Sequence, residues 1–156
     1  MYSKDEAKQL MTDFWNGFSK YSQFFSVQIG QPIEWMLYKT GIKGLELKFD
    51  LDCDGVRSVI ESNSRDENRR LEIFVDLLKY RPILESDLPA ELHWTDDHVL
   101  DVGKPVMRAY CELTGVNFHN RDNWPKLYKF MAETMWGIQT NFCDILPIFE
   151  EKYKYC

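Results

Sequence analysis

The densest acidic pattern in the chain is a run of alternating aspartates that ends at a glycine. The segment Asp50-Leu51-Asp52-Cys53-Asp54-Gly55, followed by five further residues and then Glu61, matches the calcium-binding loop of an EF-hand. Such a loop places carboxylates at its first, third and fifth positions, a glycine at the bend and a glutamate at its end, because calcium binds several oxygens around a tight turn. The pattern predicts a metal site, with calcium as the candidate ion, whose ligands are Asp50, Asp52, Asp54 and Glu61.

The same residues also fit a β-hairpin. Residues 45–53 alternate between apolar and polar side chains, which is typical of a half-buried strand. Asp54-Gly55 is a dipeptide that tight hairpin turns favour, and a two-residue loop there would set Lys48 opposite Glu61. An EF-hand instead needs a helix on each side of its loop. Calcium binding and the solvated face of a hairpin are therefore competing interpretations, and the periodicity favours the hairpin.

A second kind of chemistry is suggested by Glu46-Leu47-Lys48, which matches half of a PD-(D/E)xK nuclease site. In such a site a carboxylate and a lysine on one strand hold a metal ion and activate water. The upstream acids of this chain are not preceded by proline, so the other half of the motif is missing. A metal-dependent nuclease that uses Glu46 and Lys48 is an alternative function, and a chance pair on an exposed strand is the simpler explanation.

The remaining polar clusters do not define an active site. His93 and His98 lie close to Asp96, Asp97 and Asp101, but no CxxC pair accompanies them, so an acidic turn is favoured over a zinc site. The sequence contains no GxSxG, GxGxxG or P-loop motif. No catalytic residue and no cofactor other than calcium is predicted, and the balance favours a protein that is not an enzyme.

Three main helices are expected around these residues. The first begins at a capping box, Ser3 and Glu6, and is ended by Gly30 and Pro32. A second capping box, Ser64 and Glu67, opens a middle helix whose inner stripe is Leu71, Phe74, Val75 and Leu78. A long C-terminal helix starts near Pro125, with a kink at Pro147 or a restart capped by Asp144. Its apolar stripe comprises Tyr128, Met131, Met135, Ile138, Phe142, Ile145, Phe149 and Tyr153.

Strands are expected over residues 34–39, 45–53, the second half of the hairpin, 91–95 and 105–116, with a polar turn at 96–98. Strands of this spacing, interrupted by three helices, predict an α+β fold. The sheet would be antiparallel, with about four to five strands, and the helices would pack on one face of it. The absence of a repeat or a linker predicts one domain, residues 1–156.

Composition narrows the function classes. Of 156 residues, 15% are aromatic, and the net charge is −6, which argues against direct nucleic-acid binding because such binding depends on neutralising phosphates. The sequence shows neither a membrane-spanning run nor a signal peptide, so a cytoplasmic location is expected. Five tryptophans could pack the core, form a protein interface or line a ligand groove, and core packing is favoured: Trp15, Trp35, Trp94, Trp124 and Trp136.

Four segments resemble a known family. They are Phe14-Trp15, Gly41-Ile42-Lys43-Gly44-Leu45-Glu46-Leu47, Glu67-Asn68-Arg69-Arg70-Leu71-Glu72-Ile73-Phe74 and Asn123-Trp124-Pro125. Together they resemble the bacterial and archaeal domain of unknown function DUF4268, whose members often accompany restriction-endonuclease-like or anti-phage proteins. The resemblance implies an accessory or protein-interaction module, with a protein partner or a second copy of the chain as its target, and it brings no catalytic residues with it.

Overall fold

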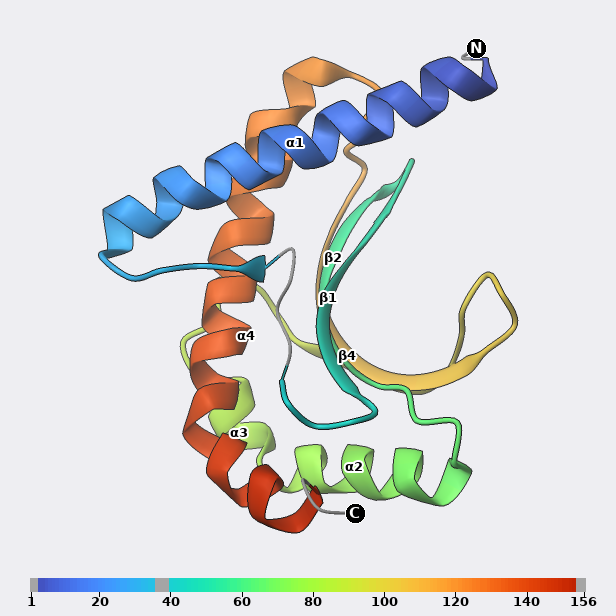
Figure 1. Cartoon of the computed structure of the whole chain (residues 1–156), viewed down its shortest axis with the longest axis vertical. Coiled ribbons are helices and arrows are strands. Elements are labelled where there is room, and N and C mark those ends of the chain that lie inside the picture. Colours follow the sequence, from blue (N-terminus) through green and yellow to red (C-terminus); the bar gives the residue numbers. More distant parts are fainter. Residues whose placement is uncertain (1–2, 36–39, 154–156) are drawn as a thin grey trace.

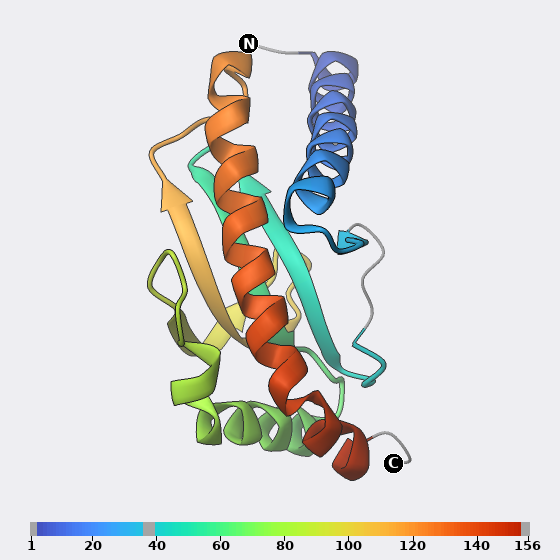
Figure 2. The same ribbon diagram turned by 90° about the vertical axis from the view of Figure 1, so that its left-hand side faces the viewer.

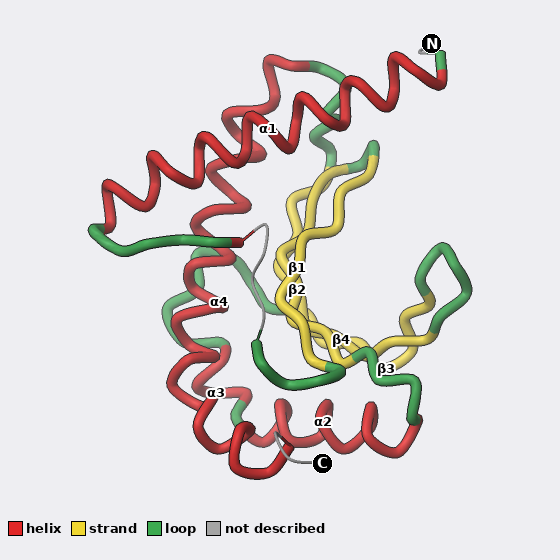
Figure 3. Tube along the Cα trace, in the orientation of Figure 1, coloured by secondary structure: helices red, strands yellow, loops and turns green. Residues whose placement is uncertain are grey.

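The computed structural model describes residues 3–35 and 40–153. The chain folds into an α+β arrangement with one antiparallel sheet, as the sequence predicts (Figures 1 and 3). In chain order the elements are α1 (Lys4–Ile29), β1 (Leu45–Asp52), β2 (Gly55–Ser62), α2 (Glu67–Lys79), α3 (Arg81–Leu84), β3 (His93–Val99), β4 (Pro105–Thr114), the 3₁₀ helix η2 (Arg121–Asn123) and α4 (Trp124–Tyr153).

The sheet has four strands in the order β1-β2-β4-β3. The strand expected over residues 34–39 lies mostly outside the described residues, and Glu34 and Trp35, which are described, are not in a strand. Figure 2 shows α4 running along one face of the sheet, while α1 crosses one end of α4 and α2 lies at the other end. No helix in the described part of the chain is long and apolar enough to cross a membrane.

The two long helices confirm the sequence reading and pack on each other. Ser3 caps α1 by accepting the backbone N–H of Glu6, and Gly30 ends it with a left-handed φ of 72°. All eight residues of the predicted α4 stripe are buried. The helices approach closely at Gly17, where a Cβ would lie 2.3 Å from the Tyr128 hydroxyl oxygen. Helix α4 continues through Pro147, so the predicted restart at residue 144 is wrong.

The hairpin forms, with its turn one residue earlier than predicted. The loop is Cys53-Asp54, so Lys48 lies opposite Val59 instead of opposite Glu61. The Asp52 carboxylate explains the difference, because its Oδ1 accepts the N–H groups of Asp54 (2.8 Å) and Gly55 (3.1 Å) and closes the turn. The register moves by two residues, which leaves each side chain on its predicted face.

The middle helix begins and faces differently from the prediction. Asp66 is its N-cap instead of Ser64, and the buried positions include Ile73, Phe74 and Leu77, whereas Leu71 and Val75 are exposed. The true inner stripe also contains Arg70, which is buried and donates from Nη1 to the Ser64 carbonyl at 3.0 Å. The inner stripe was mispredicted because the prediction used apolar residues alone, and one position of the stripe is the buried Arg70.

The third strand is longer than predicted. Residues 96–98, expected as a turn, belong to β3, which extends to Val99 with an irregularity between Thr95 and His98. The connection to β4 instead follows Leu100, whose N–H donates to the Lys104 carbonyl at 2.9 Å. Asp96, Asp97 and His98 therefore lie in a bulged strand, because a bulge accommodates extra residues without ending the pairing.

Core packing of the tryptophans is confirmed. Trp35 is buried, and the other four are partly buried against the core. Among the cysteines, Cys111 is buried whereas Cys53 and Cys143 are exposed; Cys156 lies outside the described residues.

Candidate functional site

One face of the sheet carries the residues that the sequence analysis selected for chemistry. On β2, Ser58 bonds the Thr134 hydroxyl of α4, so its neighbour Arg57 points to the opposite face. The register sets Asp50 opposite Arg57, and Glu61 opposite Arg108 of β4. We call this surface the charged face of the sheet: Lys48, Asp50, Arg57, Glu61 and Arg108.

Arg108 lies at the centre of the charged face and is 3% exposed. Its Nη2 is 3.2 Å from Asp50 Oδ2, and its Nη1 is 3.9 Å from Glu61 Oε1. Glu61 is fully buried, and its Oε2 accepts Lys48 Nζ and Asn63 Nδ2, each at 3.1 Å. The guanidinium thus lies between two of the predicted metal ligands and supplies the positive charge that buried carboxylates require.

Arg57 forms a second set of ion pairs on the same face. Its Nη1 is 3.0 Å from Asp52 Oδ2 and its Nε is 3.2 Å from Glu112 Oε2. Burial alone would lower the pKa of Arg57, but the charges of Asp52, Asp50 and Glu112 outweigh it and raise that pKa. Asp52 therefore has both oxygens engaged, one by Arg57 and one by the turn.

The four predicted metal ligands are distributed over different roles. Asp50 and Glu61 share Arg108, Asp52 holds the turn, and Asp54 is exposed in it. Strands flank the loop instead of the helices that an EF-hand needs. Among the residues that the structure describes, no group of three or more His, Cys, Asp or Glu is placed to hold a metal ion. Metal binding by these carboxylates stays a prediction.

The other predicted clusters also belong to the sheet. Glu46 is exposed opposite Glu61, while Lys48 of the nuclease-like pair is committed to Glu61. His98 is opposite Val106 on the charged face, and burial together with the Arg108 charge lowers its pKa against the opposing effect of Asp50 and Glu61. The described structure therefore brings no second set of ligands to the nuclease-like pair of Glu46 and Lys48, nor to the histidines His93 and His98.

One contact at the hairpin tip could not be read from the sequence. Cys53 Sγ lies 3.8 Å from His119 Nε2, although 66 residues separate them. His119 follows Phe118, whose ring it meets edge-on with centroids 4.7 Å apart. This contact is long and exposed, so it does not by itself define a nucleophile.

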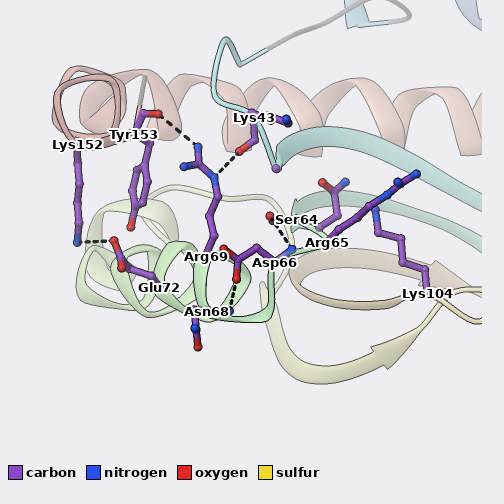
Figure 4. Close-up of a pocket in the computed structure, with 12 residues that line it drawn as sticks. Lys43, Ser64, Arg65, Asp66, Asn68, Arg69, Glu72, Lys104, Lys152 and Tyr153 are labelled. Carbon is purple, nitrogen blue, oxygen red and sulfur yellow. Dashed lines mark hydrogen bonds and ion pairs between the residues drawn. The ribbon is translucent and has the colours of Figure 1, made fainter. Parts of the chain in front are cut away.

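A second charged region is a cleft of about 840 Å³ at the other end of the molecule from the hairpin tip (Figure 4). It lies where β1 begins, β2 ends, α2 begins and α4 ends, and the loop between β3 and β4 closes one side. We call it the basic cleft, and its lining is Lys43, Gly44, Asn63, Ser64, Arg65, Asp66, Asn68, Arg69, Glu72, Lys104, Lys152 and Tyr153.

Cations outnumber acids in the basic cleft by five to two. Within the described residues the side chains of Lys43, Arg65 and Lys104 make no hydrogen bond or ion pair. Lys152 differs, because its Nζ lies 2.7 Å from Asp76 Oδ2 and contacts Glu72 as well. The cleft therefore keeps uncompensated positive charge in a chain whose net charge is −6.

The sequence analysis did not find the basic cleft. Its residues come from four separate stretches of the sequence, 43–44, 63–72, 104 and 152–153. Two of the four segments that resemble a family, 41–47 and 67–74, contribute lining residues, but a resemblance in sequence does not show which side chains converge. Convergence of loop and helix ends is a tertiary property.

Comparison with known proteins gives one match. The model of a family described as a domain of unknown function, DUF4268, matches residues 10–146. This range includes the charged face and most of the basic cleft, but not Lys152 and Tyr153. No curated protein and no solved structure matches the chain.

Proposed function

The chain belongs to the DUF4268 family, and from that premise we propose that it is a non-enzymatic interaction module that binds an acidic region of a partner protein in the basic cleft. The observation that carries the proposal is the set of three cations, Lys43, Arg65 and Lys104, around a cleft in an acidic protein. Lysine and arginine clusters of this kind attract and orient carboxylate-rich surfaces.

The charged face supports the same proposal by contrast. Most of its acids and bases are engaged with one another at 3.0–3.2 Å or hold the hairpin turn, which stabilises the sheet. Among the described residues, Glu61 Oε1 and Arg108 Nε and Nη1 are buried without a hydrogen-bond partner, so no ligand reaches them from solvent. A general base or a metal ligand needs at least one position open to its substrate. Among the described residues of the basic cleft, the charged side chains without partners are instead those of Lys43, Arg65 and Lys104, and all three are cationic.

An accessory role is part of the proposal. The family resemblance associates such modules with restriction or anti-phage proteins, so the partner would be a component of a defence system inside the cell. A second copy of the chain is the alternative occupant, because Asp96, Asp97 and Asp101 form an exposed acidic stretch on β3 and the loop after it. Sedimentation of the purified protein separates these cases, since self-association through the cleft would weaken with added salt.

The proposal is tested by titrating a fluorescent glutamate-rich peptide into the protein at low and high salt. We expect weak binding that salt suppresses, and loss of that binding when Lys43, Arg65 and Lys104 are all replaced by Gln. Lys126→Gln is the matched control, because Lys126 is an exposed lysine on α4 outside the cleft. Equal binding by the triple variant and the control would show that the cleft is not the site.

The competing metal-dependent function has its own test. Calorimetric titration with calcium, magnesium and manganese should give no heat at millimolar metal if Asp52 and Glu61 remain engaged by Arg57, Lys48 and Arg108. Heat that disappears in Asp54→Asn, a position without such partners, would favour a metal site and count against the proposal.

A further inference from the structure

Arg69 is fixed at the wall of the basic cleft. Its Nε donates to the Lys43 carbonyl at 3.1 Å and its Nη2 to the Tyr153 carbonyl at 3.3 Å, and its guanidinium stacks 5.3 Å from the Tyr153 ring. Both acceptors are neutral, so the positive charge of Arg69 is oriented but not cancelled. A preoriented guanidinium loses little conformational entropy when it binds an anion.

Arg65 and Lys104 supply cations from two other segments. Figure 4 draws both side chains on the side of the cleft away from Tyr153, whereas Arg69 lies nearer to Lys43 and Tyr153. Arg65 lies just before α2, and Lys104 ends the loop between β3 and β4. The cleft thus combines two guanidinium groups with the ammonium groups of Lys43 and Lys104. This donor set suits a compact, multiply charged oxyanion.

The shape of the cleft favours one anionic group over a polyanion. A volume of about 840 Å³ is in the range of sites that enclose a small group with its flanking atoms. Binding a nucleic-acid strand would need a basic track along several phosphates, whereas this chain is acidic overall. Lys43, Arg65, Arg69 and Lys104 line this one cleft, so a ligand with a single anionic group fits it.

We infer that the group held in the basic cleft is a phosphate monoester dianion carried by a phosphorylated segment of the partner protein. This inference rests on the proposed function and names the chemistry of its ligand. A phosphate monoester offers three terminal oxygens and close to two negative charges, whereas a carboxylate offers two oxygens and one charge. A phosphate can therefore accept charge-assisted hydrogen bonds from Arg65 and Lys104 at once, while Arg69 and Lys43 add positive charge to the same cleft.

The acidic residues of the lining do not oppose this ligand directly. Asp66 Oδ1 accepts the Asn68 N–H at 3.0 Å, which holds the carboxylate against the start of α2. Glu72 is 3.5 Å from Lys152 Nζ, so that lysine balances its charge. Within the described residues, the lining of the cleft therefore remains net positive.

The experiment compares three peptides that differ at one residue, phosphoserine, glutamate or serine, by fluorescence anisotropy. We expect the phosphoserine peptide to bind about tenfold to a hundredfold more tightly than the glutamate peptide, because it gains charge-assisted hydrogen bonds. Arg65→Lys keeps the charge but removes the planar fork, and it should lower the preference for phosphate more than the affinity for glutamate. Lys126→Gln is again the control.

A pH series provides a readout that a nonspecific basic patch would not give. The second ionisation of a phosphate monoester occurs near pH ~6, so affinity for the phosphopeptide should rise as pH increases through that value while glutamate binding stays level. Among the residues that the structure describes, no histidine lines the cleft, and the charged and titratable groups that line it are Lys43, Arg65, Asp66, Arg69, Glu72, Lys104, Lys152 and Tyr153.

Each outcome bears on a different claim. Equal affinity for phosphoserine and glutamate peptides overturns the phosphate inference and leaves the interaction module intact. Failure of both peptides to bind, or binding that Arg65→Gln and Lys104→Gln do not weaken, overturns the proposed function. Inorganic phosphate that binds as tightly as the phosphopeptide overturns the protein source of the group. A single-stranded oligonucleotide that binds more tightly than the phosphopeptide overturns both the chemistry and the partner class.

Discussion

The charged face of the sheet and the basic cleft both contain charged side chains, but these are paired with opposite charges on the charged face and largely unpaired in the cleft. On the charged face, Glu61 and Arg108 are buried and each meets an opposite charge from a neighbouring strand. In the cleft, Lys43, Arg65 and Lys104 come from the ends of different elements and meet no acid among the described residues. A high density of charged residues does not by itself indicate a binding site. In our proposal the binding site is the region whose charged side chains have no opposite charge beside them.

The difference follows from how each region is built. Adjacent strands bring side chains within about 5 Å at fixed register, so complementary charges pair and are desolvated together. Ends of helices and loops converge without such a register, and long cationic side chains there keep their hydration. We therefore expect substitutions on the charged face to affect folding, and substitutions in the cleft to affect binding.

The largest effect is expected at the buried pair. Glu61→Ala or Arg108→Ala leaves an uncompensated buried charge, which should lower the free energy of unfolding by about 3–5 kcal/mol. Urea unfolding measures the loss. A double variant, Glu61→Leu with Arg108→Met, removes both charges and should recover most of it. A double variant as unstable as the single ones would mean that the face is not held by this pairing.

Next is the turn that sets the register of the charged face. A methyl group on Gly55 would lie 1.8 Å from the Leu113 carbonyl oxygen, so Gly55→Ala must displace β2 from β4 and should cost about 1–3 kcal/mol. Thermal unfolding tests this. Asp54→Ala in the same turn is the control, because the Asp54 side chain is exposed, and it should change stability far less.

A smaller effect, which depends on pH, is expected at the margin of the cleft. Burial opposes ionisation of Asp76, but hydrogen bonds from Lys152, Tyr153 and Lys79 prevail and lower its pKa below the usual 3.8. A pKa that is lower in the folded state adds stability above the unfolded value and loses it as pH falls through the folded value. The stability difference between the wild type and Asp76→Asn should therefore be greatest near neutral pH and shrink in acid.

The smallest effect on folding is expected inside the cleft. Arg65→Gln and Lys104→Gln remove side chains that make no ion pair within the described structure, so the free energy of unfolding should change by about 0.5 kcal/mol or less. The same variants should weaken the salt-sensitive binding of acidic peptides. A large loss of stability would erase the distinction between the two regions.

The sequence predicted those parts of the fold in which the spacing of apolar residues matches the side chains that are buried. The stripe of α4 and the two faces of the hairpin follow from spacing alone, because apolar residues recur at the periods of a helix and a strand. The hairpin register was missed because Asp52 uses its side chain to close a turn at Cys53-Asp54. The stripe of α2 was missed because Arg70 is buried in it.

The candidate sites were less predictable. Lys48, Asp50 and Glu61 are near one another because the hairpin is local, so a charged surface could be anticipated there. Its central residue, Arg108, lies 47 positions after Glu61, its partner on β2, and no spacing rule finds it. The basic cleft depends wholly on such distant convergence.

Asn63 connects the two regions mechanically. Its backbone N–H bonds the Gly44 carbonyl at 2.8 Å, its side chain holds Glu61, and it lines the cleft. A group bound beside Asn63 would therefore be two hydrogen bonds away from both the start of β1 and the buried Glu61 at the end of β2.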